Sequence, residues 1–272
     1  MHPIERLRYV ARADGAGPTR LTVAAARALA GLGDDHAGLV TGCRQMVDRH
    51  PAVGTLWWLS ARLLTADDVE REAWSVTEAL ENDPVPAVLS AELPDDVTVV
   101  VIGWPELVAP ALHRRADAQV LAVDVFGEGA ALVDSLSGVD VDSAEVPESG
   151  LGAAVANADL VLLEALALGP AGAVAASGSR AAAAVARHGG TPVWMVVGEG
   201  RTLPAPMWDA LLGRLDQAGD PWDGDEEFVP ADLVDVVVGS WGRASFAEAA
   251  TRCDCPVVPE LFKGVFAPGT RQ

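Results

Sequence analysis

Hydrophobic residues recur at helical spacing through the first third of the chain. One stretch, which begins after Thr65, places its apolar residues on a single helical face at Val69, Ala73, Val76 and Leu80. We expect Thr65 to cap this helix, with Asp67 and Asp68 beside its positive N-terminus. Earlier helices are predicted over residues 18–30, 35–49 and 51–64. The spacing therefore predicts a helical segment in this part of the chain.

After Pro94 the pattern changes to short, valine-rich apolar runs. The predicted strands cover residues 97–102, 119–125, 160–163, 193–197 and 233–238. Helical spacing alternates with them at residues 105–116, 150–156, 179–188, 206–218 and 243–251. Nearly continuous apolar strands that alternate with helices are typical of a parallel sheet covered on both faces. We therefore predict an α/β fold: an N-terminal helical domain, residues 1–86, followed by a Rossmann-like doubly wound parallel-sheet domain, residues 87–272.

The carboxyl ends of the predicted strands are where a ligand of an open parallel sheet binds. Glycine-rich turns follow two of these strands, at residues 198–201 and 239–243, and a third turn, residues 176–180, opens a helix. Backbone N–H groups at a helix start can hold an anion, and arginine offers phosphate a forked donor. The predicted phosphate-binding set is Ser177, Gly178, Ser179, Arg180, Arg201 and Arg243. The structural alternative is that the glycines shape turns, Ser179 only caps a helix and the arginines are surface residues.

Other catalytic and metal-binding patterns are weaker. Cys253-Asp254-Cys255 has no second cysteine pair or nearby histidine, so buried thiols in a last strand are favoured over a metal site. No metal and no cofactor are expected. The remaining acid–base candidates are three acids at or near predicted strand ends, Glu164, Asp124 and Glu106.

The charge of the chain says more about the solvent in which the protein works than about any reaction. The net charge is −20, from 39 acidic and 19 basic residues, and this lysine-poor, acidic composition is typical of a halophile's protein. A net anion approaches a polyanion poorly, which disfavours direct binding to nucleic acid. The charged tracts 138–148 and 223–227 are interpreted as solvated loops. The lack of a membrane-spanning run or an apolar leader and the three cysteines predict a cytoplasmic protein.

One segment in the middle of the chain resembles a known family. It consists of residues 157–165 (NADLVLLEA), 169–179 (GPAGAVAASGS) and 191–194 (TPVW). Together these resemble the alpha, beta and delta subunits of translation initiation factor 2B. The same family contains the sugar-phosphate isomerases that act on ribose-1,5-bisphosphate and methylthioribose-1-phosphate. The specific match covers about residues 157–197, and the order of helical and Rossmann-like parts extends over most of the chain.

The resemblance implies partners and also a difference from the enzymes. It implies a homo-oligomer formed through the second domain, contact with initiation factor 2 or related subunits, and a phosphorylated small molecule as ligand. The isomerases carry a cysteine after the first strand of this domain and an aspartate after a Gly-Ala turn. Here those places hold Gly103-Trp104 and Leu166, none of which can move a proton.

Three functions remain open on this basis. The first is a non-catalytic initiation factor 2B-like subunit, regulatory or in assembly, that binds a phosphorylated metabolite or nucleotide. The second is an aldose–ketose isomerase of sugar phosphates with a rearranged acid–base set built on Glu164, Asp124 or Glu106. The third is a metabolite-binding module without a role in translation, because function resides in the site and not in the fold.

Overall fold

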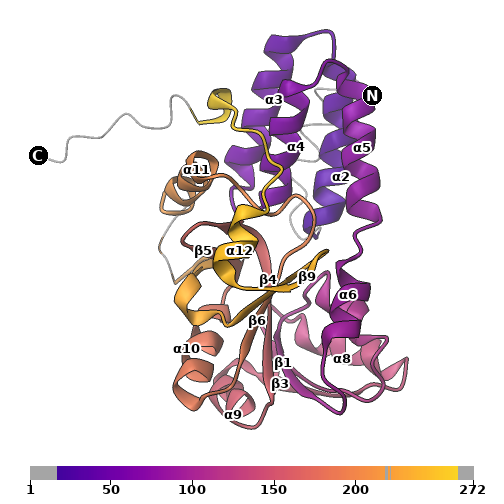
Figure 1. The fold of residues 1–272 in the computed structure, drawn as a ribbon, viewed down its shortest axis with the longest axis vertical. Coiled ribbons are helices and arrows are strands. Elements are labelled where there is room, and N and C mark those ends of the chain that lie inside the picture. Colours follow the sequence, from indigo (N-terminus) through magenta and orange to yellow (C-terminus); the bar gives the residue numbers. More distant parts are fainter. Residues whose placement is uncertain (1–16, 218–219, 221, 263–272) are drawn as a thin grey trace, which may run out of the picture. The chain divides into compact units, whose positions relative to one another are not determined.

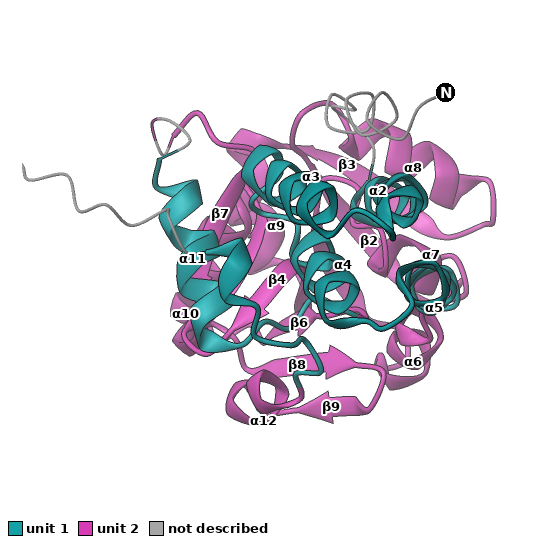
Figure 2. Ribbon diagram, turned by 90° about the horizontal axis from the view of Figure 1, so that it is seen from above, with its two compact units in different colours: residues 1–82, 200–219, 253–272 teal, residues 83–199, 220–252 magenta. Residues whose placement is uncertain are grey.

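The computed structural model describes residues 17–217, 220 and 222–262 (Figure 1). It divides into two compact units, shown in different colours in Figure 2. The first takes residues from the ranges 1–82, 200–219 and 253–272, and the second from 83–199 and 220–252. The predicted boundary after residue 86 stays a prediction. The first unit also gathers two segments from beyond it, and the ends of the predicted domains, 1–16 and 263–272, lie outside the described residues.

The first unit is helical. Its α-helices are α2 (Pro18–Leu29), α3 (His36–Arg49), α4 (Gly54–Thr65), α5 (Val69–Glu81) and α11 (Ala205–Leu215), with short 3-10 turns at η1 (Ala30–Leu32) and η4 (Pro259–Leu261). The expectation that Thr65 caps the fourth helix was wrong: Thr65 is the last residue of α4, and the carboxylate of Asp68 accepts the N–H of Arg71 at 3.0 Å. An aspartate at this position can satisfy one of the free N–H groups of the first turn.

The second unit contains a nine-stranded sheet within the described residues. Its strands are β1 (Thr98–Ile102), β2 (Gln119–Asp124), β3 (Asp142–Pro147), β4 (Leu160–Gly169), β5 (Gly172–Ala176), β6 (Val193–Val196), β7 (Glu226–Pro230), β8 (Val236–Gly239) and β9 (Gly242–Ala244). The main order is β3-β2-β1-β4-β6-β8-β9, and its strands are parallel except for β9. Outside this order, β5 pairs antiparallel with β4, and β7 pairs antiparallel with β5. The predicted α/β class with a mainly parallel sheet is confirmed.

Helices cover both faces of this sheet. They are α6 (Val85–Glu92), α7 (Val108–Leu112), α8 (Gly129–Ser137), α9 (Leu151–Ala156), α10 (Ser179–Gly189) and α12 (Phe246–Thr251), with 3-10 turns η2 (Glu148–Gly150) and η3 (Ala231–Leu233). Alternate residues of β1 enter different cores: Val100 packs with residues of α9, α10 and α12, and Val101 packs with residues of α6, α7 and α8. Figure 1 shows α9 and α10 on one side of the strands and α6 and α8 on the other. No helix of the described residues is long and apolar enough to cross a membrane.

Three of the sequence-based expectations need correction here. The tracts 138–148 and 223–227, expected to be solvated loops, contain β3 and the start of β7. The strand expected to end at residue 163 continues to Gly169, with a register shift between Ala165 and Ala167 where its pairing passes to β5. The cysteines expected in a last strand lie in an irregular stretch after α12.

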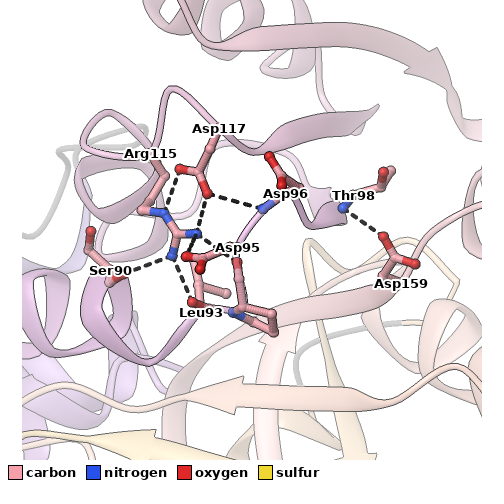
Figure 3. A network of polar contacts seen from close by, with 9 residues as sticks. Ser90, Leu93, Asp95, Asp96, Thr98, Arg115, Asp117 and Asp159 are labelled. Atoms are coloured by element: carbon pink, nitrogen blue, oxygen red, sulfur yellow. Dashed lines mark hydrogen bonds and ion pairs between the residues drawn. The ribbon is translucent and has the colours of Figure 1, made fainter.

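Hydrogen bonds and an ion pair of charged residues connect the segments at the amino ends of β1, β2 and β4 (Figure 3). Arg115, which is buried, donates from Nε to Asp117 Oδ1 at 2.8 Å, and Asp117 Oδ2 accepts the N–H of Asp96 at 3.2 Å. Asp159 accepts the N–H of Thr98, the first residue of β1, at 2.9 Å. The guanidinium also donates to the carbonyls of Ser90, Leu93 and Pro94. Because these bonds lie at the edge opposite the expected ligand site, we interpret them as structural.

Candidate functional site

The candidate site lies where the direction of strand addition reverses. From β1 the chain adds β2 and β3 on one side, and β4, β6 and β8 on the other. In an open α/β sheet, ligands bind beyond the carboxyl ends of the strands at such a reversal. The reversal lies between the neighbouring strands β1 and β4. The candidate residues lie in the segments that follow β1 and β2, on β4, and in the turn before α10. The chemistry available depends on what the side chains at this edge contact.

Glu164 stands at the reversal itself, and its carboxylate is engaged. Its Oε2 accepts the backbone N–H of Leu107 at 2.7 Å and that of Val108 at 3.1 Å, at the start of α7. Glu164 pairs with Val196 of β6, and the next residue of β4 already pairs with β5, so Glu164 lies within a strand and not at its end. An acidic group at a helix N-terminus is favourable because it meets free N–H groups there. This geometry makes Glu164 a cap for α7.

The other two acid–base candidates lie on neighbouring turns. Asp124 ends β2, and its Oδ1 accepts the N–H of Gly129 at 2.8 Å where α8 begins. The backbone approach is close here: a Cβ added to Gly129 would lie 2.8 Å from the Cα of Asp124. Glu106 is half-buried in the turn between β1 and α7. Next to it, Trp104 N–H donates to Glu128 Oε2 at 3.2 Å, so several acids of this edge hold backbone N–H groups.

The predicted phosphate turn lies at the same edge. Gly178 has φ +93, a left-handed conformation that favours glycine, and a Cβ there would meet Ile102 and Val125 side chains at 3.7 and 3.8 Å. Ser179, 2% exposed, begins α10, and the side chain of Arg180 is exposed. The turn therefore lies beside the residue that ends β1 and the residue that follows β2.

A carboxylate of the chain already occupies the start of α10. Glu227 Oε1 accepts the backbone N–H of Arg180 at 2.9 Å, and the Ser177 N–H donates to the carbonyl of Asp225 at 2.9 Å. Burial, with the charge of Asp225, raises the pKa of neighbouring Glu226. Sequence reasoning missed Glu227 because it read residues 223–227 as a loop. The pattern Glu-Glu-Phe-Val before Pro230, with its β-forming Phe and Val, was the available signal for a strand.

The remaining arginines of the predicted set have other surroundings. Arg243, on β9, pairs through Nε with Glu92 Oε2 at 2.8 Å, and its guanidinium lies 5.4 Å from the centroid of the Trp194 ring. Arg201 belongs to the first unit, where it is 1% exposed, whereas Arg180 and Arg243 belong to the second. Phosphate binding by the predicted set stays a prediction.

The cysteines do not form a recognisable metal site. Within the described ranges no group of three or more histidine, cysteine, aspartate or glutamate side chains could hold a metal ion. Cys253 Sγ donates to the carbonyl of Thr202 at 3.1 Å, and burial raises the pKa of the Cys255 thiol. Burial also raises the pKa of Cys43 to about 12. The thiols therefore favour the protonated form at neutral pH.

Comparison with known proteins finds similar solved structures but no match to a family model or to a curated protein. No family model matches the chain, and no curated protein matches it. Among solved structures, the Pyrococcus horikoshii OT3 translation initiation factor eIF-2B is similar with a TM-score of 0.74 at 13% identity, over 89% of this chain and 96% of that one. The eIF2B beta subunit of Chaetomium thermophilum is similar with a TM-score of 0.73 at 15% identity, over 95% and 92%.

A third similar chain comes from the tetrameric eIF2B-beta2-delta2 complex of C. thermophilum, with a TM-score of 0.72, 16% identity, and 92% and 93% of the two chains covered. The three likenesses extend over nearly the whole of both chains. They confirm the fold that the sequence resemblance implied. At these identities the likeness concerns the fold, because function depends on the site. The chain therefore has the fold of the initiation factor 2B subunits.

Proposed function

We propose that the protein is a non-catalytic member of the initiation factor 2B alpha/beta/delta family, acting in the cytoplasm as a regulatory or assembly subunit. The observation that carries the non-catalytic part is the Glu164 carboxylate. A rearranged isomerase would need a free acid at this edge, and Glu164 instead accepts two backbone N–H groups at the start of α7. Its Oε2 is therefore already engaged in holding the start of α7.

The positions at which the related isomerases carry their reacting groups support the same proposal. Gly103 and Trp104 follow β1, where the resemblance would place a cysteine. Leu166 lies at the register shift of β4, where it would place an aspartate. Neither a leucine nor a tryptophan can supply the proton transfer between sugar carbons. Asp124 is likewise engaged, because its Oδ1 accepts the Gly129 N–H.

The assembly part of the proposal draws on the similar proteins. The beta and delta subunits of C. thermophilum form a tetrameric complex. We infer that this chain likewise pairs with copies of itself or with related subunits through the predicted second domain, and that initiation factor 2 is a partner. A phosphorylated metabolite or nucleotide at Ser177–Arg180 would have to displace the carboxylate of Glu227. Such a ligand would act as a signal and would not be turned over.

Two arms of one experiment test this proposal. The full chain, in molar potassium chloride, is incubated with ribose-1,5-bisphosphate and then with other pentose phosphates, and ketose formation is measured. We expect no turnover above the buffer. Turnover that disappears in Glu164→Gln or Asp124→Asn would establish the isomerase instead. In the second arm, tagged protein is recovered from its native high-salt lysate: co-purified initiation factor 2 supports the translation role, and its absence favours a metabolite-binding module.

A further inference from the structure

A shallow hollow on the outer face of α5 combines an exposed tryptophan with acids. It is lined by Asp68, Glu70, Arg71, Trp74, Ser75 and Glu78. The Trp74 side chain is 68% exposed, whereas Ala73, Val76 and Leu80 of the same helix are buried. Glu70, Trp74 and Glu78 are spaced by four residues, so they form one stripe along the helix surface. The stripe does not take part in the packing of α5.

The acids of α5 differ in whether they have partners. Glu72 pairs with Arg62, Glu81 pairs with Arg27, and Asp68 accepts the N–H of Arg71. Glu70 and Glu78 make no ion pair with any residue in the described part of the chain. Both residues are exposed, so a cation from solvent or from another protein can reach them.

The other tryptophans of the molecule indicate what this surface would accept. Four of them lie beneath an arginine: Arg62 on Trp58, Arg214 on Trp57, Arg243 on Trp194 and Arg252 on Trp241, with guanidinium carbons 4.7 to 5.4 Å from the ring centroids. The negative face of an indole attracts a cation, and tryptophan is the strongest of the aromatic residues in this respect. Trp74 is also exposed, and a glutamate lies one helical turn away from it in each direction.

We propose that this hollow, lined by the six residues named above, docks an arginine- or lysine-bearing segment of another protein. The cation lies on the Trp74 ring, and Glu70 and Glu78 pair with its flanking charges. Tryptophan is enriched among the residues that dominate protein interfaces. A second copy of the same surface is a poor occupant, because it would bring like charges together in a chain whose net charge is −20. The inference does not rest on the function proposed above.

Fluorescence anisotropy of a labelled peptide of arginine, glycine and serine, titrated with the full-length protein, tests this proposal. We expect Trp74→Ala, or Glu70→Gln with Glu78→Gln, to weaken binding about tenfold or more, and Trp74→Phe to retain part of it. The control for the aromatic change is Trp222→Ala, at another exposed tryptophan, 79% accessible, in the second unit. The control for charge is Glu145→Gln with Glu148→Gln, two exposed acids far from α5 in sequence.

The outcomes separate docking from general attraction to an acidic protein. Selective loss in the α5 variants, with both controls unchanged, supports the proposal. Equal weakening by the two double glutamine variants would mean that the peptide senses only net charge and would overturn it. No binding to the wild type, or self-association that depends on Trp74, would overturn it as well. Circular dichroism of every variant checks that α5 remains folded. A failure of this test leaves the assembly and turnover experiments unaffected.

Discussion

The carboxylate of Glu227 accepts the backbone N–H of Arg180 at 2.9 Å and so occupies the N-terminus of α10. This is the position at which the sequence predicted a bound phosphate. A carboxylate and a phosphate compete for the same positive end of a helix. A side chain of the protein thus fills the anion position that was predicted for a ligand. Competition between Glu227 and a phosphate for this position can be measured.

Removal of the Glu227 charge should increase the affinity for phosphate. In Glu227→Gln we expect inorganic phosphate or ribose-1,5-bisphosphate to raise the melting temperature more than in the wild type, because no anion has to be displaced. A ligand at 100 times its Kd would add about 2.7 kcal/mol to the free energy of unfolding. The matched control is Glu145→Gln, which removes the same charge from β3. If Glu227→Gln and the wild type respond alike, the start of α10 is not the anion site.

Loss of the Glu164 carboxylate should destabilise the second unit. Glu164→Leu leaves the N–H groups of Leu107 and Val108 without their acceptor, and we expect a loss of about 2–4 kcal/mol in the free energy of unfolding. Glu164→Gln keeps a neutral acceptor and should cost about 1 kcal/mol. Urea unfolding followed by circular dichroism measures both. A change in Glu164→Leu no larger than that in the exposed control Glu148→Gln would contradict a capping role.

The Arg115–Asp117 pair predicts a pH dependence of stability. The hydrogen bond from Arg115 lowers the pKa of the Asp117 carboxyl below its ordinary value of 3.8 in the folded protein. The unfolded state therefore binds the proton more readily, so the pair contributes stability above about pH 4 and loses it as the pH falls further. The difference in urea midpoint between wild type and Asp117→Asn should accordingly be present at pH 7 and shrink below pH 4. A difference that grows on acidification would be the wrong sign for this pair.

Arg214 connects three parts of the first unit. Its Nε donates to Asp48 at 2.7 Å, its Nη2 donates to the Leu261 carbonyl at 2.8 Å, and its guanidinium carbon lies 4.7 Å from the centroid of the Trp57 ring. We expect Arg214→Met to reduce the free energy of unfolding by about 2–4 kcal/mol, because a buried acceptor and a ring face lose their partner.

Tryptophan fluorescence in a urea titration measures this loss. Arg214→Lys should recover little of it, since an ammonium group cannot bridge the same groups with a planar fork. Arg180→Met, at an exposed side chain, serves as the control and should change the stability by less than about 0.5 kcal/mol. Equal stability of Arg214→Met and this control would show that the contacts of Arg214 contribute nothing.

The alternation of apolar runs and helices was enough to predict the parallel sheet. The run expected over residues 97–102 contains β1, because fully buried strands carry continuous apolar sequence. Strand β7 was missed since Glu226 and Glu227 look like a solvated loop until the pairing with β5 is known. The role of the Glu164 carboxylate could not be predicted either. Its partner is the backbone at the start of α7, 57 residues earlier in the chain, and no local pattern indicates such a contact.

Sedimentation velocity of the full chain in molar potassium chloride tests the central claim most directly. A subunit of the initiation factor 2B type should sediment as an assembly whose mass is a multiple of 28.2 kDa, and the assembly should persist on dilution. A single species of 28.2 kDa at every concentration and salt, with no mass gained when initiation factor 2 is added, would contradict the account.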